Sequence, residues 1–421
     1  MSSKTQDARG RPQRKLTLLF IAAGGIFAFI GTILGALMLG NMSGLGVYLR
    51  IYAAHPYLQI FGFLAEFVCG VAYSVVPLFK SRKVPNLRVA YLLFFLITIA
   101  NILSIAAVLE SGSYYNILLD VTSFLVLLSS IIFAYQVIDL VGRPSKILGE
   151  GEPFLSLSAS SFLLVSLVFF LNTAFPTLLS SNGELFTFDF LYLSLVGFVG
   201  SMIYGVELKT TVFRMTNYRK NFARAAVYLQ AISIMLAFVS SFKGLSSNLL
   251  SWPLYISALL CTIFFAISIK IFEMKRSSKP LMPVTSGNSN VASHQIITFF
   301  TDVSVLSSVL WLLFSLVLAA AWILFGIQSF ALRDTFIHSM AIGFIGSAVT
   351  AYGPVLLPGV LSMRAPKKHL SFLPLLFLNS GLLIRIAGDF YSSGQAFLPL
   401  WESSSGGLII AAMILFIIET H

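Results

Sequence analysis

The chain has 421 residues, of which 57% are hydrophobic and only 10% are charged. A soluble domain of this length cannot enclose so much apolar surface in one core, so the composition excludes a soluble globular protein. The formal net charge of +11 then indicates contact with anionic lipid at one membrane face, and we expect no nucleic-acid partner.

Apolar runs of membrane-spanning length follow one another along the chain and predict an all-α integral membrane protein with twelve transmembrane helices. The last run has the weakest signal, because Trp401 to Ser405 is polar. The expected spans are 16–39, 55–79, 87–109, 117–141, 153–176, 187–208, 222–242, 249–271, 296–326, 334–358, 370–391 and 401–419.

The distribution of Lys and Arg predicts the orientation of these spans, because loops kept in the cytoplasm carry most of the basic residues. With a cytoplasmic N-terminus, every inner segment is basic. Only four basic residues lie elsewhere: Arg50, Lys243 and Arg333 in outer segments and Arg385 within a span. We therefore expect a multi-pass protein of the plasma membrane with both termini in the cytoplasm.

A Gly-Phe pair recurs in the second, sixth and tenth spans, as Gly62-Phe63, Gly197-Phe198 and Gly343-Phe344. The equal topological interval predicts one polytopic domain, residues 1–421, built from three sets of four helices. The approximate limits of these repeats are 1–146, 147–280 and 294–421. Generic glycine packing between membrane helices is the alternative explanation.

Two histidines begin marked helices near the outer face: His55 in the second span and His338 in the tenth. Two neutral imidazoles at similar depth can bind one iron from opposite sides and give a six-coordinate, low-spin heme. The small residues below them would make room for the macrocycle. The alternative is a pair of interfacial histidines that hydrogen-bond at the headgroup level.

The segment from Asp334-Thr335 through His338 to Pro358 resembles the tenth helix of subunit I of the heme-copper oxidase superfamily. His55 to Pro77 resembles its second helix. That superfamily has twelve helices in three sets of four, and histidines of its second and tenth helices hold a low-spin heme. The resemblance therefore implies a subunit I-like fold, with His55 and His338 as the iron ligands.

A closer resemblance is to the NnrS family of membrane heme and copper proteins, which is associated with nitrosative stress. It rests on the run from His338 to Gly343, a Pro/Gly-rich helix end, a basic loop, and the run from Leu378 to Arg385.

The chain departs from the oxidase pattern where the binuclear centre would lie. The position of the oxidases' second histidine, two residues before His338, is Phe336, and spans six and seven contain no histidine. Phe cannot bind iron, so we expect no copper and no terminal oxidase activity.

Two arginines are further candidates. Arg385 is expected to bind a heme propionate, as the resembling families imply, or to pair with Asp389 four residues later. Arg50, just before His55, is a second candidate for a propionate.

Glu66 lies eleven residues after His55, and it could belong to a proton path or be a structural carboxylic acid. The same two readings apply to Glu207 near the inner end of the sixth span. Cys69 and Cys261 both fall inside spans and are expected to be small buried residues.

The leading hypothesis is therefore a membrane protein with one low-spin heme b, which acts in electron transfer or in the response to nitric oxide. Its partners would be the lipid bilayer and an unidentified redox protein. The alternatives are a secondary transporter, although carriers of this size usually divide into two halves, and a cofactor-free scaffold subunit of a respiratory complex.

Overall fold

The computed structural model describes residues 3–39, 53–80, 83–110, 114–142, 151–179, 186–214, 218–242, 248–276, 291–325, 329–353, 372–391 and 400–420. These segments are almost entirely helical, and no β-sheet occurs among them. Eleven of the described helices are long and apolar enough to cross a membrane. The prediction of a multi-pass helical membrane protein is thus confirmed. The twelfth expected span corresponds to a shorter apolar helix, Ser404–Ile418.

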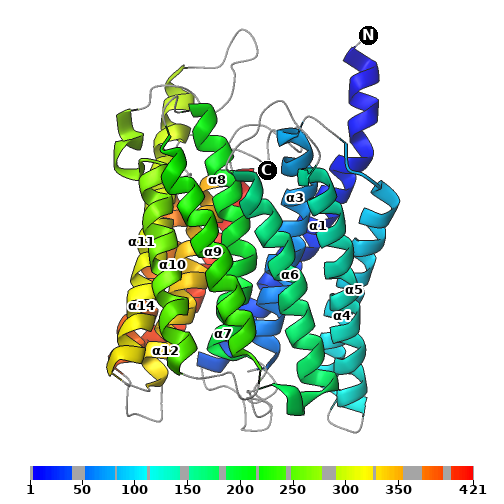
Figure 1. Ribbon diagram of the computed structural model, residues 1–421, viewed down its shortest axis with the longest axis vertical. Coiled ribbons are helices and arrows are strands. Elements are labelled where there is room, and N and C mark those ends of the chain that lie inside the picture. The colour runs from blue at the N-terminus through cyan, green and yellow to red at the C-terminus, as the bar shows by residue number, and fades with distance from the viewer. Residues whose placement is uncertain are drawn as a thin grey trace. The chain divides into compact units, whose positions relative to one another are not determined.

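The described helices form two compact units. The first comprises Met1–Met38, Met42–Met202 and Ala237–Ser247. Within it, α4 packs against α5, α5 against α6 and α6 against η3, and the long helices run side by side (Figure 1). Its helices are α1 (Ser3–Leu39), η1 (Leu58–Ala65), α3 (Glu66–Phe79), α4 (Leu87–Leu109), α5 (Tyr114–Gly142), α6 (Gly151–Ala174), η2 (Pro176–Leu178), α7 (Phe188–Tyr192) and η3 (Leu193–Gly200).

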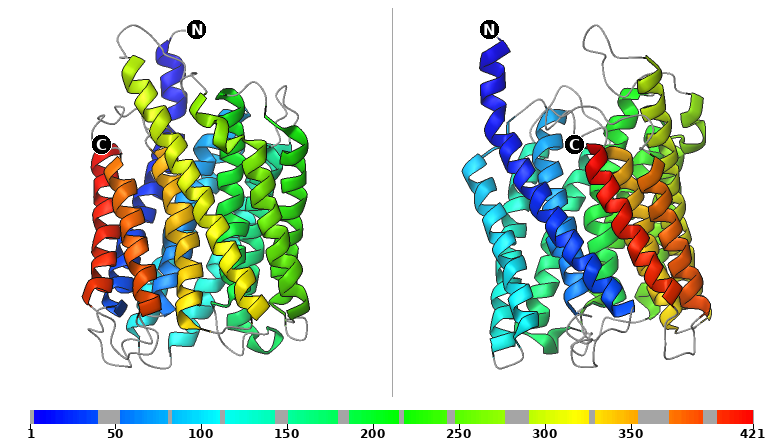
Figure 2. Two further views of the ribbon diagram at one scale, coloured as in Figure 1. Left: turned by 90° about the vertical axis from the view of Figure 1, so that its left-hand side faces the viewer. Right: turned by 180° about the vertical axis from the view of Figure 1, so that it is seen from behind.

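The second unit comprises Leu39–Asn41, Ile203–Leu236 and Asn248–His421. Within it, α10 packs against α11, α11 against η5, and α14 against α15, which lie side by side in Figure 2. Its helices, two of them shared with the first unit, are α8 (Ser201–Arg214), α9 (Lys220–Ser240), α10 (Asn248–Ser268), η4 (Ile271–Arg276), α11 (Val291–Phe325), α12 (Phe330–His338), η5 (Ser339–Gly346), α14 (Phe372–Tyr391) and α15 (Leu400–Thr420).

The second, sixth and tenth spans share a feature that hydropathy does not predict. Each contains a π-helical segment of eight residues, namely η1, η3 and η5. The Gly-Phe pair occupies the fifth and sixth positions in all three, with the sequences LQIFGFLA, LSLVGFVG and SMAIGFIG. A π segment is rare, so its recurrence in one register supports the predicted three sets of four helices, which remain a prediction.

The same three spans are also the most buried of the eleven. Over an 18-residue apolar stretch of each span, the buried share is 83% in Ala53–Phe79, 94% in Phe188–Thr210 and 67% in Ala331–Gly353, against 28–56% in the other eight. A helix that is apolar all round and little exposed to lipid is an inner helix. His55, Glu66 and His338 therefore lie on inner helices.

Two helix starts illustrate ordinary capping rules. The Ser329 side chain accepts a hydrogen bond from the backbone N–H of Leu332 at 3.2 Å and so begins α12. Asn86 caps α4 in the same way, with its side-chain oxygen 3.1 Å from the backbone nitrogen of Arg88. Such caps satisfy backbone donors that the first helical turn leaves unpaired.

Candidate functional site

The His55 ring packs closely against α1, where it forms a hydrogen bond and occupies the space above Gly35. Its Nδ1 lies 2.7 Å from the backbone oxygen of Gly31. A Cβ atom at Gly35 would lie 2.8 Å from the His55 Cε1, so the imidazole fits only because residue 35 is glycine. One turn further, the Gln59 amide donates to the Thr32 hydroxyl at 3.1 Å.

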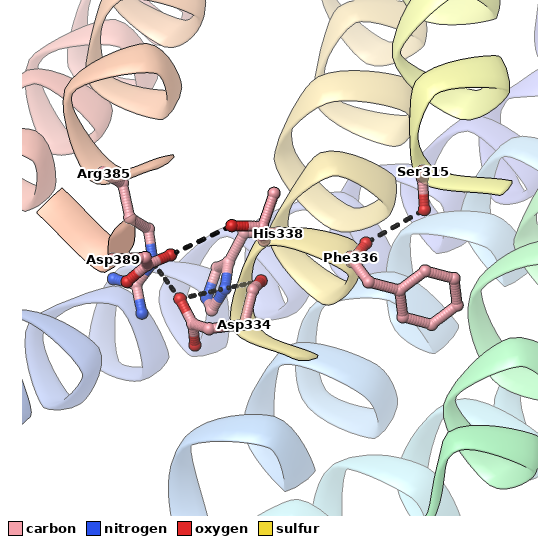
Figure 3. Close-up of polar contacts among 7 residues, drawn as sticks. Ser315, Asp334, Phe336, His338, Arg385 and Asp389 are labelled. Carbon is pink, nitrogen blue, oxygen red and sulfur yellow. Dashed lines mark hydrogen bonds and ion pairs between the residues drawn. The ribbon is translucent and has the colours of Figure 1, made fainter. Parts of the chain in front are cut away.

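His338 is the last residue of α12, and its ring is anchored on its own helix. Its Nδ1 lies 2.9 Å from the backbone oxygen of Asp334 and 3.1 Å from the Asp334 Oδ2. Arg385 of α14 donates from Nε to the same Oδ2 at 2.7 Å. Figure 3 shows this chain of contacts from Arg385 through Asp334 to the imidazole.

The two histidines share a hydrogen-bonding pattern that fixes their tautomers. A backbone carbonyl oxygen can only accept a hydrogen bond, so Nδ1 must carry the proton in both rings. A metal could then bind either ring only through Nε2. An imidazole oriented by an Nδ1–H bond to a carbonyl or carboxylate is the usual form of a histidine that ligates a metal.

The ion-pair partner of Arg385 lies on another helix, α12. The spacing of four residues predicts Asp389 as a partner, and the structure shows an ion pair with Asp334, 51 positions away in sequence. The Asp389 Oδ2 accepts from the Thr335 hydroxyl at 3.4 Å. The exposed fractions of the Arg385 and Asp334 side chains are 13% and 11%, so the pair is largely shielded from solvent.

Phe336 points away from His338, to the opposite side of α12 (Figure 3). Its side chain is 1% exposed and packs edge to face on Tyr255, with the ring centroids 6.1 Å apart. Where the oxidase pattern has a metal ligand, this chain therefore has an aromatic packing residue. Within the described residues, no group of three or more His, Cys, Asp or Glu side chains could hold a metal ion.

The glycines do not make room for a macrocycle, and that expectation is wrong for three of them. A Cβ at Gly62 would lie 2.7 Å from the Phe27 Cβ, and one at Gly70 would lie 2.8 Å from the Phe20 Cβ. One at Gly343 would lie 2.5 Å from the indole of Trp311. These glycines admit aromatic side chains of neighbouring helices, as in ordinary packing of membrane helices.

Glu66 is completely buried, and so is much of its surroundings. Its Oε1 accepts hydrogen bonds from the Thr98 hydroxyl at 2.9 Å and from the Asn101 amide at 3.4 Å. Glu207 is also buried, with 2% of its surface exposed. Cys69 and Cys261 are free and buried, as the sequence predicts.

Arg50 and Pro358 lie outside the described residues. Asp334 was missed as a site residue, although its position four residues before His338 in a helix was a usable signal.

Comparison with known proteins gives two partial similarities. The model of a domain of unknown function, DUF8744, matches residues 286–420. An uncharacterized protein of Aquifex aeolicus (strain VF5) is 25% identical over 225 residues, which cover 52% of this chain and 53% of the relative. The chain thus spans about half the length of this relative. The region that resembles the domain of unknown function contains Asp334, His338 and Arg385 and nearly coincides with the third predicted repeat.

Proposed function

We propose that this chain is a membrane heme protein of NnrS-like or oxidase subunit I-like architecture. It would hold one low-spin heme b through His55 and His338, and act in electron transfer or in the response to nitric oxide. The observation that carries the proposal is the shared Nδ1–H geometry of the two rings, which directs metal binding to Nε2 in both.

The donor set fits a heme in its chemistry. Two neutral imidazoles on inner helices suit a six-coordinate iron, which exchanges single electrons without binding a substrate. Arg385 remains our candidate for a propionate, and Asp334 holds its guanidinium in place. Phe336 supports the absence of a second heme site, because its side chain cannot ligate iron.

The visible spectrum of the purified protein tests this proposal. Sharp α and β bands after reduction are expected, with one heme per chain. His55→Ala and His338→Ala should each abolish these bands, and His369→Ala, a histidine that the sequence places in an inner loop, should leave them intact. Unchanged bands in both single variants would refute the ligand assignment.

One observation favours a second candidate, a secondary transporter. Carriers usually divide into two halves, and the described helices form two compact units that correspond approximately to the first six and the last six spans. The same spectrum separates the two candidates, because a transporter would show no heme bands when it is purified from heme-replete cells.

A further inference from the structure

A second site, independent of the proposed heme, lies around Glu66 in the first unit. Glu66 is 0% exposed within a membrane span, and it forms no ion pair with any described residue. An ionised carboxylate in such a place is strongly disfavoured unless a proton or a cation neutralises it. The charge of Glu66 therefore needs a partner that the described side chains do not supply.

The neighbours of Glu66 are polar but uncharged. Helix α4 presents Thr98 and Asn101, whose side chains both donate to the Glu66 Oε1. Helix α1 presents Gly24, where a Cβ would lie 3.3 Å from the Glu66 Cβ. The titratable groups that interact with Glu66 are Tyr57 and Cys69, both on its own span.

The orientation of the Asn101 amide is fixed by its two acceptors. Its Nδ2 donates to the backbone oxygen of Phe61 at 3.2 Å and to the Glu66 Oε1 at 3.4 Å. Rotating the amide by 180° would place oxygen against oxygen at both contacts, so Oδ1 is the atom that remains. The Phe61 carbonyl belongs to the π segment η1, which thereby shapes this pocket.

Two buried oxygen atoms here, Glu66 Oε2 and Asn101 Oδ1, have no hydrogen-bond partner among the described residues. The buried Tyr57 Oη lies near the Ser104 hydroxyl, but that hydroxyl donates to the Asn101 backbone oxygen at 2.7 Å, and no hydrogen bond of ordinary geometry reaches Oη. Oε2 and Oδ1 lie near each other, because each is bonded to the same carbon as an atom of the Asn101–Glu66 hydrogen bond, and Tyr57 lies close enough to Glu66 to interact with its charge. The Tyr57 ring is held by Phe61 and Phe169, at centroid distances of 5.2 and 5.6 Å. Buried polar atoms that lie near one another without a protein partner are suited to hydrogen-bond a small polar ligand such as water.

We propose that Glu66, Asn101 and Tyr57 form a buried site that binds one exchangeable proton together with one water molecule. The proton resides on the Glu66 Oε2, which donates to the water. The water donates to the Asn101 Oδ1 and accepts from the Tyr57 hydroxyl. Every orphaned atom then gains a partner, the carboxyl is neutral, and the water makes three hydrogen bonds, which is typical of buried water.

Infrared spectroscopy of the full-length protein in lipid vesicles tests the site directly. At neutral pH we expect the carbonyl stretching band of a protonated carboxyl, shifted to lower frequency in D₂O. Glu66→Gln, which keeps the shape of the side chain, should remove one carboxyl per chain from this band. Glu110→Gln, at the end of the same α4 that contacts Glu66, is the matched control and should leave the band unchanged.

A second variant and a change of salt distinguish a bound proton from a bound cation. Asn101→Leu should move the band to higher frequency, because the carboxyl loses the hydrogen bond from Asn101 and keeps only the one from Thr98. A band that is unaffected by Glu66→Gln, or one that appears only when Na⁺ and K⁺ are removed, would overturn the proposal. The second outcome would instead assign a monovalent cation to the pocket.

Discussion

At the scale of single residues, Asp334 is expected to have the largest effect on the redox potential of the proposed heme. Its carboxylate lies 3.1 Å from the Nδ1 of His338 and 2.7 Å from the Nε of Arg385. A carboxylate behind a ligating imidazole makes that imidazole a stronger electron donor, whereas a nearby guanidinium offsets negative charge. Asp334 and Arg385 are therefore expected to shift the redox potential in opposite directions.

Asp334→Asn should raise the midpoint potential. The variant removes a negative charge near the heme and makes the His338 imidazole a weaker electron donor, and both changes destabilise the oxidised iron. Arg385→Leu should lower it, because the reduced heme loses a positive charge. An electrostatic change of about 1 kcal/mol corresponds to about 43 mV for one electron, so shifts of tens of millivolts are expected. Redox titration followed by visible absorbance measures both. Shifts of the same sign, or none in folded variants, would contradict the assignment.

The sequence could reveal the two histidines but only part of what surrounds them. The pairing of Asp334 with His338 is local, at a helical spacing of four, and could have been read from the chain. The contact of Arg385 with Asp334 and that of His55 with the Gly31 carbonyl join different helices, 51 and 24 positions apart. Such contacts depend on how helices rotate against each other, which hydropathy does not specify.

At the scale of helices, hydropathy alone located the spans well. The expected span 87–109 coincides with α4, and the others differ from the observed spans by a few residues where the structure describes them. The π segments were not predicted, because a change from i+4 to i+5 bonding leaves no compositional trace. The Gly-Phe pairs mark the three helices that contain these segments, and Gly62 and Gly343 are glycines because neighbouring aromatic side chains pack against them.

The contact between α1 and the second span gives a prediction about Gly35. Gly35→Val should displace the His55 imidazole, since even a Cβ would lie 2.8 Å from its Cε1. Overpacking of this kind costs about 1–3 kcal/mol, and here it should weaken the low-spin heme bands. Gly25→Val is the matched control, because a Cβ at Gly25 meets nothing within 4 Å. Equal spectra of the two variants would show that the ring position does not matter.

A buried ion pair joins three helix ends in the first unit. The Lys80 Nζ lies 3.0 Å from the Glu152 Oε2 and donates to the Val141 carbonyl, also at 3.0 Å. The exposed fractions of the Lys80 and Glu152 side chains are only 1% and 7%. Lys80→Met should destabilise the protein by about 3–5 kcal/mol, because a buried carboxylate loses its partner.

Thermal unfolding in detergent measures this effect. Lys80→Met combined with Glu152→Leu should regain much of the lost stability, since no buried charge then remains. If the double variant is as unstable as the single one, the contribution of Lys80 is packing of its aliphatic stem rather than charge.

At the scale of the whole molecule, two ways of dividing the chain remain in tension. The π segments and the Gly-Phe pairs support three sets of four helices, and the match of the domain of unknown function to residues 286–420 coincides with the third set. Packing gives two compact units instead. A sequence repeat shows which segments of the chain are similar, whereas the compact units show which helices pack against each other. The division into two units could therefore not be derived from the repeat.

The orientation of the chain in the membrane is the last prediction. Basic residues concentrate in alternate loops, so the loop around Ser286 should face the cytoplasm and the loop around Ser113 should face outward. Single cysteines at these positions can be labelled with a membrane-impermeant maleimide in intact cells. Cys69 and Cys261 are buried and should give little background. Ser113→Cys should react at once, and Ser286→Cys only after the cells are permeabilised. The opposite result would invert the topology and place His55 and His338 near the cytoplasmic face.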